Sequence, residues 1–246
     1  MPLPVSPHDP YRSIAAAYDA EFDGANADTA GYASRAVAGS LLVLGCGTGR
    51  VCRGLASTRQ VTGLDRSPAM IEGARRRGPD DVRWVVAAMT DFDLGPFGEI
   101  IIPNASFAFL PDRRARAACL ARCLQALSGG GPVTIDLPAP DARLLAEAHT
   151  PEKIAWEGQV DGATVRRTRE VFRFPLRGNL RLVDRYYIDG APPIESVLAL
   201  HLFVPDELEW MLEANGFYVE QAWGDHVGGP VREGCDRLLV RAVPVG

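Results

Sequence analysis

The sequence predicts an α/β fold, in which a doubly wound sheet of seven mostly parallel strands carries an antiparallel β flap inserted after strand five. Short, nearly continuous apolar runs alternate with helical patterns up to about residue 140, as expected of parallel strands that helices cover on both faces. A glycine-rich turn follows the first of these runs. From residue 153 to 204 apolar and polar residues instead alternate, which is typical of antiparallel strands.

The first half of the predicted sheet follows from four apolar runs. A helix at 11–22, with apolar residues at i, i+3/4 spacing, precedes a small, polar segment at 24–31 that we expect to be a mobile loop. The strands are expected at 41–44, 61–65, 82–87 and 99–104, with helices at 51–56 and 68–77 between them. Ser67 caps the second of these helices, and Pro68 occupies its first position.

The remaining elements complete the sheet and insert the flap. Asp112 caps a helix that runs to residue 127, and strand five is expected at 133–137. Turn signals at Asp161-Gly162, 177–179 and Asp189-Gly190 divide the alternating region into hairpins. A helix from 205 to 216 and strands at 217–223 and 237–243, with a loop at 224–234 between them, end the chain.

Composition excludes several classes of protein. The 246 residues are 47% hydrophobic and 23% charged with a net charge of −5, which argues against a nucleic-acid or anionic-membrane surface. No apolar stretch reaches the about 18 residues of a membrane span, and the first residues lack signal-peptide features. The five cysteines show no zinc-ligand spacing, so we expect no metal and a reducing, cytoplasmic location. Cys119 and Cys123, four apart on a helix, are expected to pack in the core.

The loop after the first strand is the most specific motif. Gly45, Gly47 and Gly49 form a G-x-G-x-G turn, and Arg50 stands where a dinucleotide fingerprint would need its third glycine. Asp65 ends the next strand, 20 residues after the first glycine, where a carboxylate can accept both ribose hydroxyls. The motif therefore indicates a ligand with an adenosine but no pyrophosphate. A ligand-free turn, with Asp65 as a capping acid, is the alternative interpretation.

Several segments together resemble a known family. The segment 41–50 resembles the first motif of class I S-adenosylmethionine-dependent methyltransferases, and 61–65 resembles the second. Residues 11–19, read as Y-x-x-x-A-x-x-Y-D, are similar to the N-terminal lid of many members, and 127–137 and 208–219 resemble later segments. The layout is most similar to that of small-molecule enzymes such as aminosugar or glycine-type N-methyltransferases.

The resemblance implies a single Rossmann-like methyltransferase domain over 1–246, with a lid at 1–35, a cofactor-binding core at 36–150, a substrate flap at 151–204 and the end of the core sheet at 205–246. It implies S-adenosyl-L-methionine as the cofactor. The expected cofactor-binding residues are Tyr11, Tyr18, Gly45, Cys46, Gly47, Thr48, Gly49, Asp65, Arg66, Met70, Ala88, Met89, Thr90, Pro103, Asn104 and Ala105.

Two positions depart from the family pattern. Val43 stands where an acid usually contacts the methionyl amino group, and Ala88 stands where an aspartate often contacts the adenine. Thr90 or Asp91 could substitute for the latter. These departures motivate an alternative function, in which the protein binds the cofactor but catalyses a non-methylating reaction such as cyclisation or isomerisation, or only binds. A nucleotide-dependent dehydrogenase is a third possibility, against which Arg50 argues.

Methyl transfer requires alignment of the reacting atoms and, for a hydroxyl or ammonium acceptor, a base. His201, at the end of the flap just before a helix, is the expected catalytic base, although a lone histidine is more often structural. Arg166, Arg167 and Arg169 are expected to form a solvated face or to meet an acidic substrate. Weaker candidates for the base are Tyr186, Tyr187, Asp225 and His226.

The predicted function is therefore methylation of a nitrogen or oxygen of a small molecule, in natural product biosynthesis. The expected partner is that small-molecule substrate, and a homodimer is left open.

Overall fold

The computed structural model describes residues 11, 14–22, 27–140 and 147–246. Its larger sheet has seven strands in the order β10-β11-β5-β4-β1-β2-β3. The first five strands in sequence run parallel, and β11 joins β5 antiparallel. The strands are β1 (Leu41–Leu44), β2 (Val61–Asp65), β3 (Arg83–Val86), β4 (Glu99–Ile102), β5 (Val133–Pro138), β10 (Phe217–Trp223) and β11 (Arg237–Pro244).

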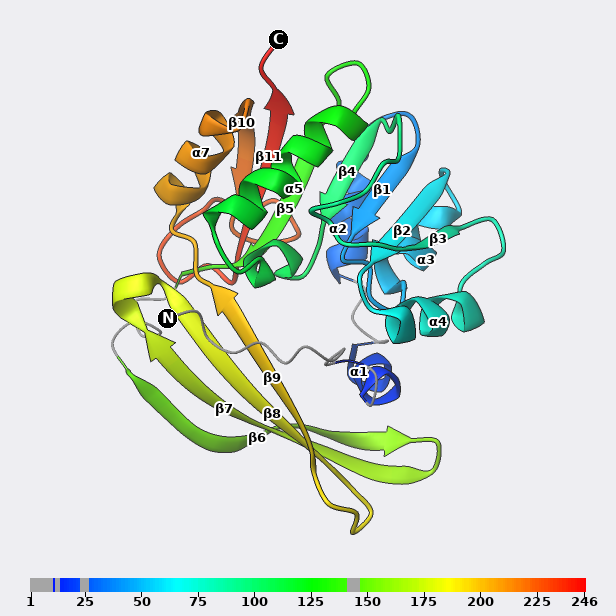
Figure 1. The fold of residues 1–246 in the computed structure, drawn as a ribbon, viewed down its shortest axis with the longest axis vertical. Helices are drawn as coiled ribbons and strands as arrows, with labels where there is room; N and C mark the ends of the chain where they lie inside the picture. The colour runs from blue at the N-terminus through cyan, green and yellow to red at the C-terminus, as the bar shows by residue number, and fades with distance from the viewer. Residues whose placement is uncertain (1–10, 12–13, 23–26, 141–146) are drawn as a thin grey trace.

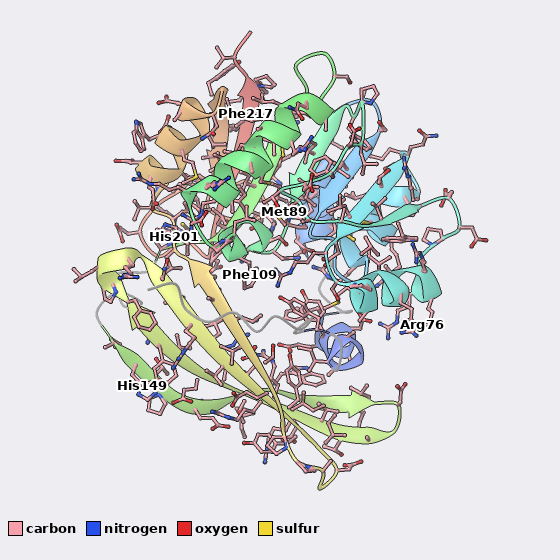
Figure 2. All side chains as sticks on the ribbon, in the orientation of Figure 1. Arg76, Met89, Phe109, His149, His201 and Phe217 are labelled. Atoms are coloured by element: carbon pink, nitrogen blue, oxygen red, sulfur yellow. The ribbon has the colours of Figure 1, made fainter. Side chains whose placement is uncertain are left out.

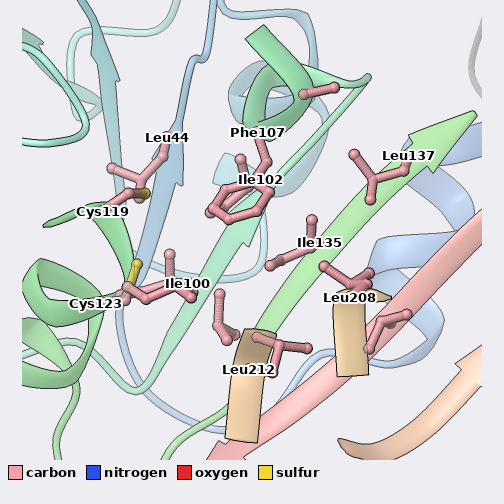
Figure 3. Close-up of a cluster of buried hydrophobic side chains, with 14 of the residues drawn as sticks. Leu44, Ile100, Ile102, Phe107, Cys119, Cys123, Ile135, Leu137, Leu208 and Leu212 are labelled. Atoms are coloured by element: carbon pink, nitrogen blue, oxygen red, sulfur yellow. The ribbon is translucent and has the colours of Figure 1, made fainter. Parts of the chain in front are cut away.

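Helices cover both faces of this sheet because its strands are apolar on both sides. Side chains of α2 (Ala27–Ser34), α3 (Arg50–Ala56) and α4 (Pro68–Arg77) pack with Leu41 and Val43 on one face. On the other face, α5 (Arg113–Ala126), α7 (Pro205–Ala214) and the short helix η1 (Ser106–Phe109) enclose the larger core cluster, which includes Cys119 and Cys123 as predicted (Figure 3). Burying each large side chain contributes roughly 1.5–3 kcal/mol.

The second sheet is antiparallel, in the order β6-β7-β8-β9. It lies below the core sheet, and α1 (Ala15–Phe22) lies between the two (Figure 1). Asp161-Gly162 and Asp189-Gly190 have positive φ, as the predicted hairpin turns require. The elements are β6 (His149–Val160), β7 (Ala163–Phe174), the short helix η2 (Pro175–Arg177), β8 (Asn179–Ile188) and β9 (Ile194–His201). The predicted fold class is thereby confirmed.

The predicted loop at 24–31 is wrong, because Ala27–Ser34 forms the helix α2; residues 23–26 lie outside the described residues. Its sequence is small and polar and predicts no helix. Tertiary contacts hold it instead, since Tyr32 is buried and donates to Asp136 while Asp28 pairs with Arg50. The helix predicted at 11–22 begins later, at Ala15, and residues 12–13 also lie outside the described residues.

Strand ends also differ from the prediction. β4 ends at Ile102 rather than 104, because Asn104 and Ala105 adopt positive φ and turn the chain. β3 is the sheet edge and is half-exposed, so only Arg83–Val86 pair as a strand. The flap sheet begins at His149, within the segment assigned to the core from sequence, because the register with β7 extends past Pro151.

Candidate active site

A cavity of about 420 Å³ lies at the carboxyl ends of the core strands. This is where ligands bind in open α/β sheets, at the point where the strand order reverses between β1 and β4. Its described lining comes from the lid, the core and the flap: Tyr11, Tyr18, Gly45, Cys46, Gly47, Thr48, Arg50, Val51, Leu64, Asp65, Arg66, Met70, Ala88, Met89, Thr90, Pro103, Asn104, Ser106, Phe109, Leu110, Pro111, Ala115, Val197, Leu198 and Ala199.

The three loop glycines serve different purposes. A side chain at Gly45 would approach Ser106 to 2.6 Å, and one at Gly49 would clash with the ring of Trp84. At Gly47, with φ of +56°, an added carbon would meet nothing within 4 Å. Gly47 therefore opens the loop backbone to the cavity, whereas Gly45 and Gly49 allow close packing beneath it. A backbone cradle of this kind fits a nucleoside.

Asp65 is fixed by the backbone around it. Its Oδ2 accepts from the Gly47 amide at 2.9 Å, and its Oδ1 accepts from the Ser67 amide at 2.9 Å. The cap of α4 is Ser67 itself, whose hydroxyl accepts from the Met70 amide. The carboxylate is thus held rigidly in the cavity wall, in a position that fits the predicted contact with ribose hydroxyls.

The segment after β4 adopts an uncommon backbone conformation beside the cavity. Asn104 and Ala105 have φ of 51° and 64°, a region that asparagine tolerates and that alanine rarely adopts. Asp136, fully buried within β5, stabilises the turn by accepting from the Asn104 backbone amide at 3.3 Å. Tyr32, Arg237 and His226 also contact this carboxylate. Burial favours neutral Asp136, but His226, Arg237 and Tyr32 outweigh it and keep its pKa below the usual value.

Arg50, at the start of α3, lines the cavity and forms an ion pair with Asp28 of α2. Each terminal nitrogen of Arg50 donates to one oxygen of Asp28, at 2.7 and 2.5 Å. The Asn104 side chain donates to Oδ2 of Asp28 at 3.3 Å. Burial opposes ionisation of Asp28, but the hydrogen bonds and charge of Arg50 lower its pKa. Both charges are therefore present beside the cavity at neutral pH.

The far side of the cavity is apolar. The short helix η1 packs against β9 there, and Phe109 of η1 lies on the side of the core that faces the flap (Figure 2). Among its described residues, this wall contains no titratable side chain. We call it the apolar wall, and it comprises Phe109, Leu110, Pro111, Ala115, Val197, Leu198 and Ala199.

The tyrosines and the thiol that line the cavity are poor bases. Burial raises the pKa of Tyr18 to about 12 and raises that of Tyr11 further. Burial also raises the pKa of the Cys46 thiol, which therefore stays protonated.

His201 is outside the described cavity lining. It lies at the core end of β9 (Figure 2), where its Nδ1 is 2.9 Å from Asn179 Oδ1 and its Nε2 is 2.8 Å from Glu207 Oε1. Burial and the charge of Arg116 lower its pKa. These contacts tie the flap to α7 and hold His201 outside the described lining.

The other candidate bases are also engaged elsewhere. Tyr187 donates to Glu152, His226 contacts Asp136, and the carboxylate of Asp225 accepts from backbone amides of its own loop. Burial raises the pKa of Tyr186.

The three flap arginines do not form one solvated face. Arg167 is buried between Glu21 of α1 and Asp184, and Arg169 pairs with Asp184. Arg166 packs over the ring of Tyr187. None of the three is in the described cavity lining, so an acidic substrate would not meet them there.

The structure brings all of the expected cofactor-binding residues into the cavity lining except Gly49 and Ala105. Gly49 packs under Trp84, and Ala105 accompanies the Asn104 turn without reaching the lining. Sequence reasoning missed the apolar wall and the role of Arg50 as a lining residue. In the sequence, Arg50 served only to exclude a dinucleotide. An arginine at the start of a helix, beside a ligand-binding loop, is a signal that could have predicted a positive charge at the site.

Comparisons with known proteins agree with this geometry. A family model for a methyltransferase domain matches residues 41–131. Trans-aconitate 2-methyltransferase from Acidovorax sp. (strain JS42) is 30% identical over 131 residues, which cover 50% of this chain and 48% of that protein. The chain therefore matches the curated relatives over about half of their length or less.

Solved structures match along nearly the whole chain. An S-adenosylmethionine-dependent methyltransferase from Clostridium acetobutylicum has a TM-score of 0.79 at 13% identity, with 97% of this chain and 100% of that one covered. CalS10, an amino pentose methyltransferase from Micromonospora echinaspora solved with S-adenosylmethionine bound, has a TM-score of 0.68 at 25% identity, with 92% and 91% covered.

Residues 41–131 thus match a methyltransferase domain, and the predicted resemblance to class I S-adenosylmethionine-dependent methyltransferases is confirmed. S-adenosyl-L-methionine is the cofactor that these matches indicate, and the glycine cradle and Asp65 fit it. Within the described residues, no helix is long and apolar enough to cross a membrane.

Proposed function

We propose that this protein transfers a methyl group from S-adenosyl-L-methionine to a nitrogen of a small molecule in natural product biosynthesis. The observation that carries the proposal is a single cavity with two unlike halves. One half combines the glycine loop, Asp65 and Asn104 and suits a polar nucleoside with an amino-acid end. The other half is the apolar wall, beyond β4, which suits the carbon skeleton of an acceptor.

The residues of the polar half bind and orient. Asp65 would hold the ribose, and the loop around Gly47 would lie against the nucleoside. The chemistry that the cofactor supplies when bound is a methyl group on a sulfonium sulfur, which is a good leaving group. The protein then needs chiefly to align the acceptor with the methyl carbon, and orientation of this kind is worth as much as ~7–11 kcal/mol.

The apolar wall favours nitrogen over oxygen as the acceptor atom. A hydroxyl needs a base to become a good nucleophile, whereas an amine in its neutral form does not. The described residues of the wall supply no base, and the lining tyrosines hold their protons. A desolvated apolar surface also favours the neutral form of an amine. The likeness to an amino pentose methyltransferase supports the same choice.

Calorimetry with S-adenosylhomocysteine tests the cofactor assignment. The chain should bind it, and Asp65→Ala should weaken binding by at least the ~1.5–3 kcal/mol of a charge-assisted hydrogen bond. Absence of binding at ~1 mM would sink the proposal. Unchanged affinity in Asp65→Ala would remove the ribose assignment. Glu72→Gln, an exposed carboxylate on α4, is the matched control and should bind normally.

A non-methylating reaction is the second candidate, because Val43 is buried in β1 and Ala88 lines the cavity where the family pattern has acids. Mass spectrometry of products formed with a deuterated methyl donor separates the two. Gain of one labelled methyl group by an amine refutes the second candidate, and conversion of an acceptor without gain of the label refutes the first.

A further inference from the structure

The amino-acid end of the proposed cofactor needs opposite charges in the protein. It combines a carboxylate with an ammonium, and burying either without a partner is costly. In the described lining, Asp65 ends β2 and Arg66 follows it, so both lie at the nucleoside side. Arg50 is the charged lining residue next to β1 and β4, towards which the rest of such a ligand would extend.

Among the described residues, three carboxylates lie next to this part of the lining, and two of them are also held by residues outside it. Asp19 accepts from the hydroxyl of Thr48 and pairs with Arg77 at 2.6 Å. Asp136 is fully buried and shared between Tyr32, Arg237 and His226. Asp28 differs from both, because each of its side-chain partners outside α2, Arg50 and Asn104, is a lining residue.

We propose that Arg50 and Asp28 together bind the α-amino-acid end of the cofactor, the carboxylate on the guanidinium of Arg50 and the ammonium on Asp28 with Asn104. The inference rests on the proposed function. The contact of 3.3 Å from the Asn104 amide to Asp28 Oδ2 is long, whereas charge-assisted bonds are typically about 2.7–2.9 Å. A ligand ammonium would therefore replace this contact and bond to Oδ2.

The same pair would position the lid relative to the core. Asp28 belongs to α2, the helix that sequence analysis assigned to a loop, and Arg50 belongs to the first turn of the helix that follows the glycine loop. A ligand that bridges them would connect the lid to the core. This supplies from outside the sheet the negative charge that Val43 cannot supply within it.

Calorimetry with two ligands tests the proposal: S-adenosylhomocysteine, which has the amino-acid end, and 5′-methylthioadenosine, which lacks it. The wild-type chain should bind S-adenosylhomocysteine at least tenfold more tightly. Asp28→Asn should raise its Kd by about 10–100-fold and that of 5′-methylthioadenosine by less than about threefold. Arg50→Lys, which keeps the charge but not the paired N–H groups, should show the same selectivity.

The matched control is Asp184→Asn, which also removes a buried carboxylate from an arginine pair, but in the flap sheet. It should leave the ratio of the two affinities unchanged. A merely structural role of Asp28 would weaken both ligands equally, and that result overturns the inference. Equal affinity of the wild-type chain for both ligands also overturns it, whether or not the variants fold. Failure of both ligands to bind the wild-type chain instead overturns the proposed function, and the inference with it.

Discussion

The carboxyl edge of the seven-stranded core sheet and the exposed face of the four-stranded flap sheet use charged residues in different ways. All residues of β1 and β4 are buried, whereas no residue of β6 is. In the core sheet, the fully buried Asp136 has fixed partners in α2, β11 and the loop before it. On the flap, Arg185 is shared among three partly exposed acids, Glu152, Glu170 and Glu195.

This difference shows that a charged side chain constrains the fold where it is buried and not where it is exposed to water. An ion pair in water contributes little, because solvent already satisfies both partners. A buried carboxylate has no such alternative, so its partners must be in place before the element can pack. The partners of Asp136 therefore fix the carboxyl edge of the core sheet, and the candidate site lies at that edge. The flap sheet instead contributes shape, through the apolar residues of β9.

Asp136→Asn is the largest test of this contrast. It should cost about 3–5 kcal/mol of unfolding free energy, because Arg237 is left partly buried without its counter-charge. The control Glu195→Gln, on the exposed face of the flap, should cost less than about 1 kcal/mol. Urea denaturation measures both, and equal costs would remove the distinction between the sheets.

The same variant changes the pH dependence of stability. The pKa of Asp136 is lower in the folded chain than in the unfolded one. Its contribution is therefore present above the ordinary pKa of an aspartate and is lost as the pH falls through the folded value. Asp136→Asn should flatten this acid limb.

Ala199→Leu tests the apolar wall. The added carbons would fill the acceptor half of the cavity and leave the nucleoside half as it is. Affinity for S-adenosylhomocysteine should stay within about threefold, whereas kcat/KM for the acceptor should fall at least tenfold, which corresponds to about 1.4 kcal/mol. Ala191→Leu, at an exposed turn of the flap, is the control. Parallel losses for both ligands would show that the halves are not separate.

His201→Gln should have the smallest effect on catalysis. Its pKa is lowered in the folded chain, so the unfolded chain binds more protons below about pH 6.5. The wild-type chain should then lose stability as the pH falls from that value towards the folded pKa, and the variant should lose this part of the slope. Melting curves between pH 5 and 8 measure it. A large drop in rate together with a changed pH–rate profile would instead restore His201 as the base.

Much of the core sheet could be predicted because its signals are local. The strands at Leu41–Leu44 and Val61–Asp65, the Ser67 cap and the Asp161-Gly162 turn depend on residues that are neighbours in sequence. The helix α2 could not be predicted, because its stability comes from contacts of Asp28 and Tyr32 with residues far along the chain. The positions of the candidate bases could not be predicted for the same reason.

Arg50 illustrates which properties the sequence determines locally and which depend on the tertiary structure. By itself, the sequence determined that the loop would end in arginine rather than glycine, which excluded a dinucleotide and favoured a smaller adenosine ligand. It also determined the strand that presents Asp65, because hydrophobic periodicity and glycine conformations act over a few residues. Only the tertiary structure decided that Arg50 faces the cavity with Asp28 behind it, and that His201 lies outside the described lining. Burial and charge pairing between distant segments determine those positions, and no local pattern encodes them.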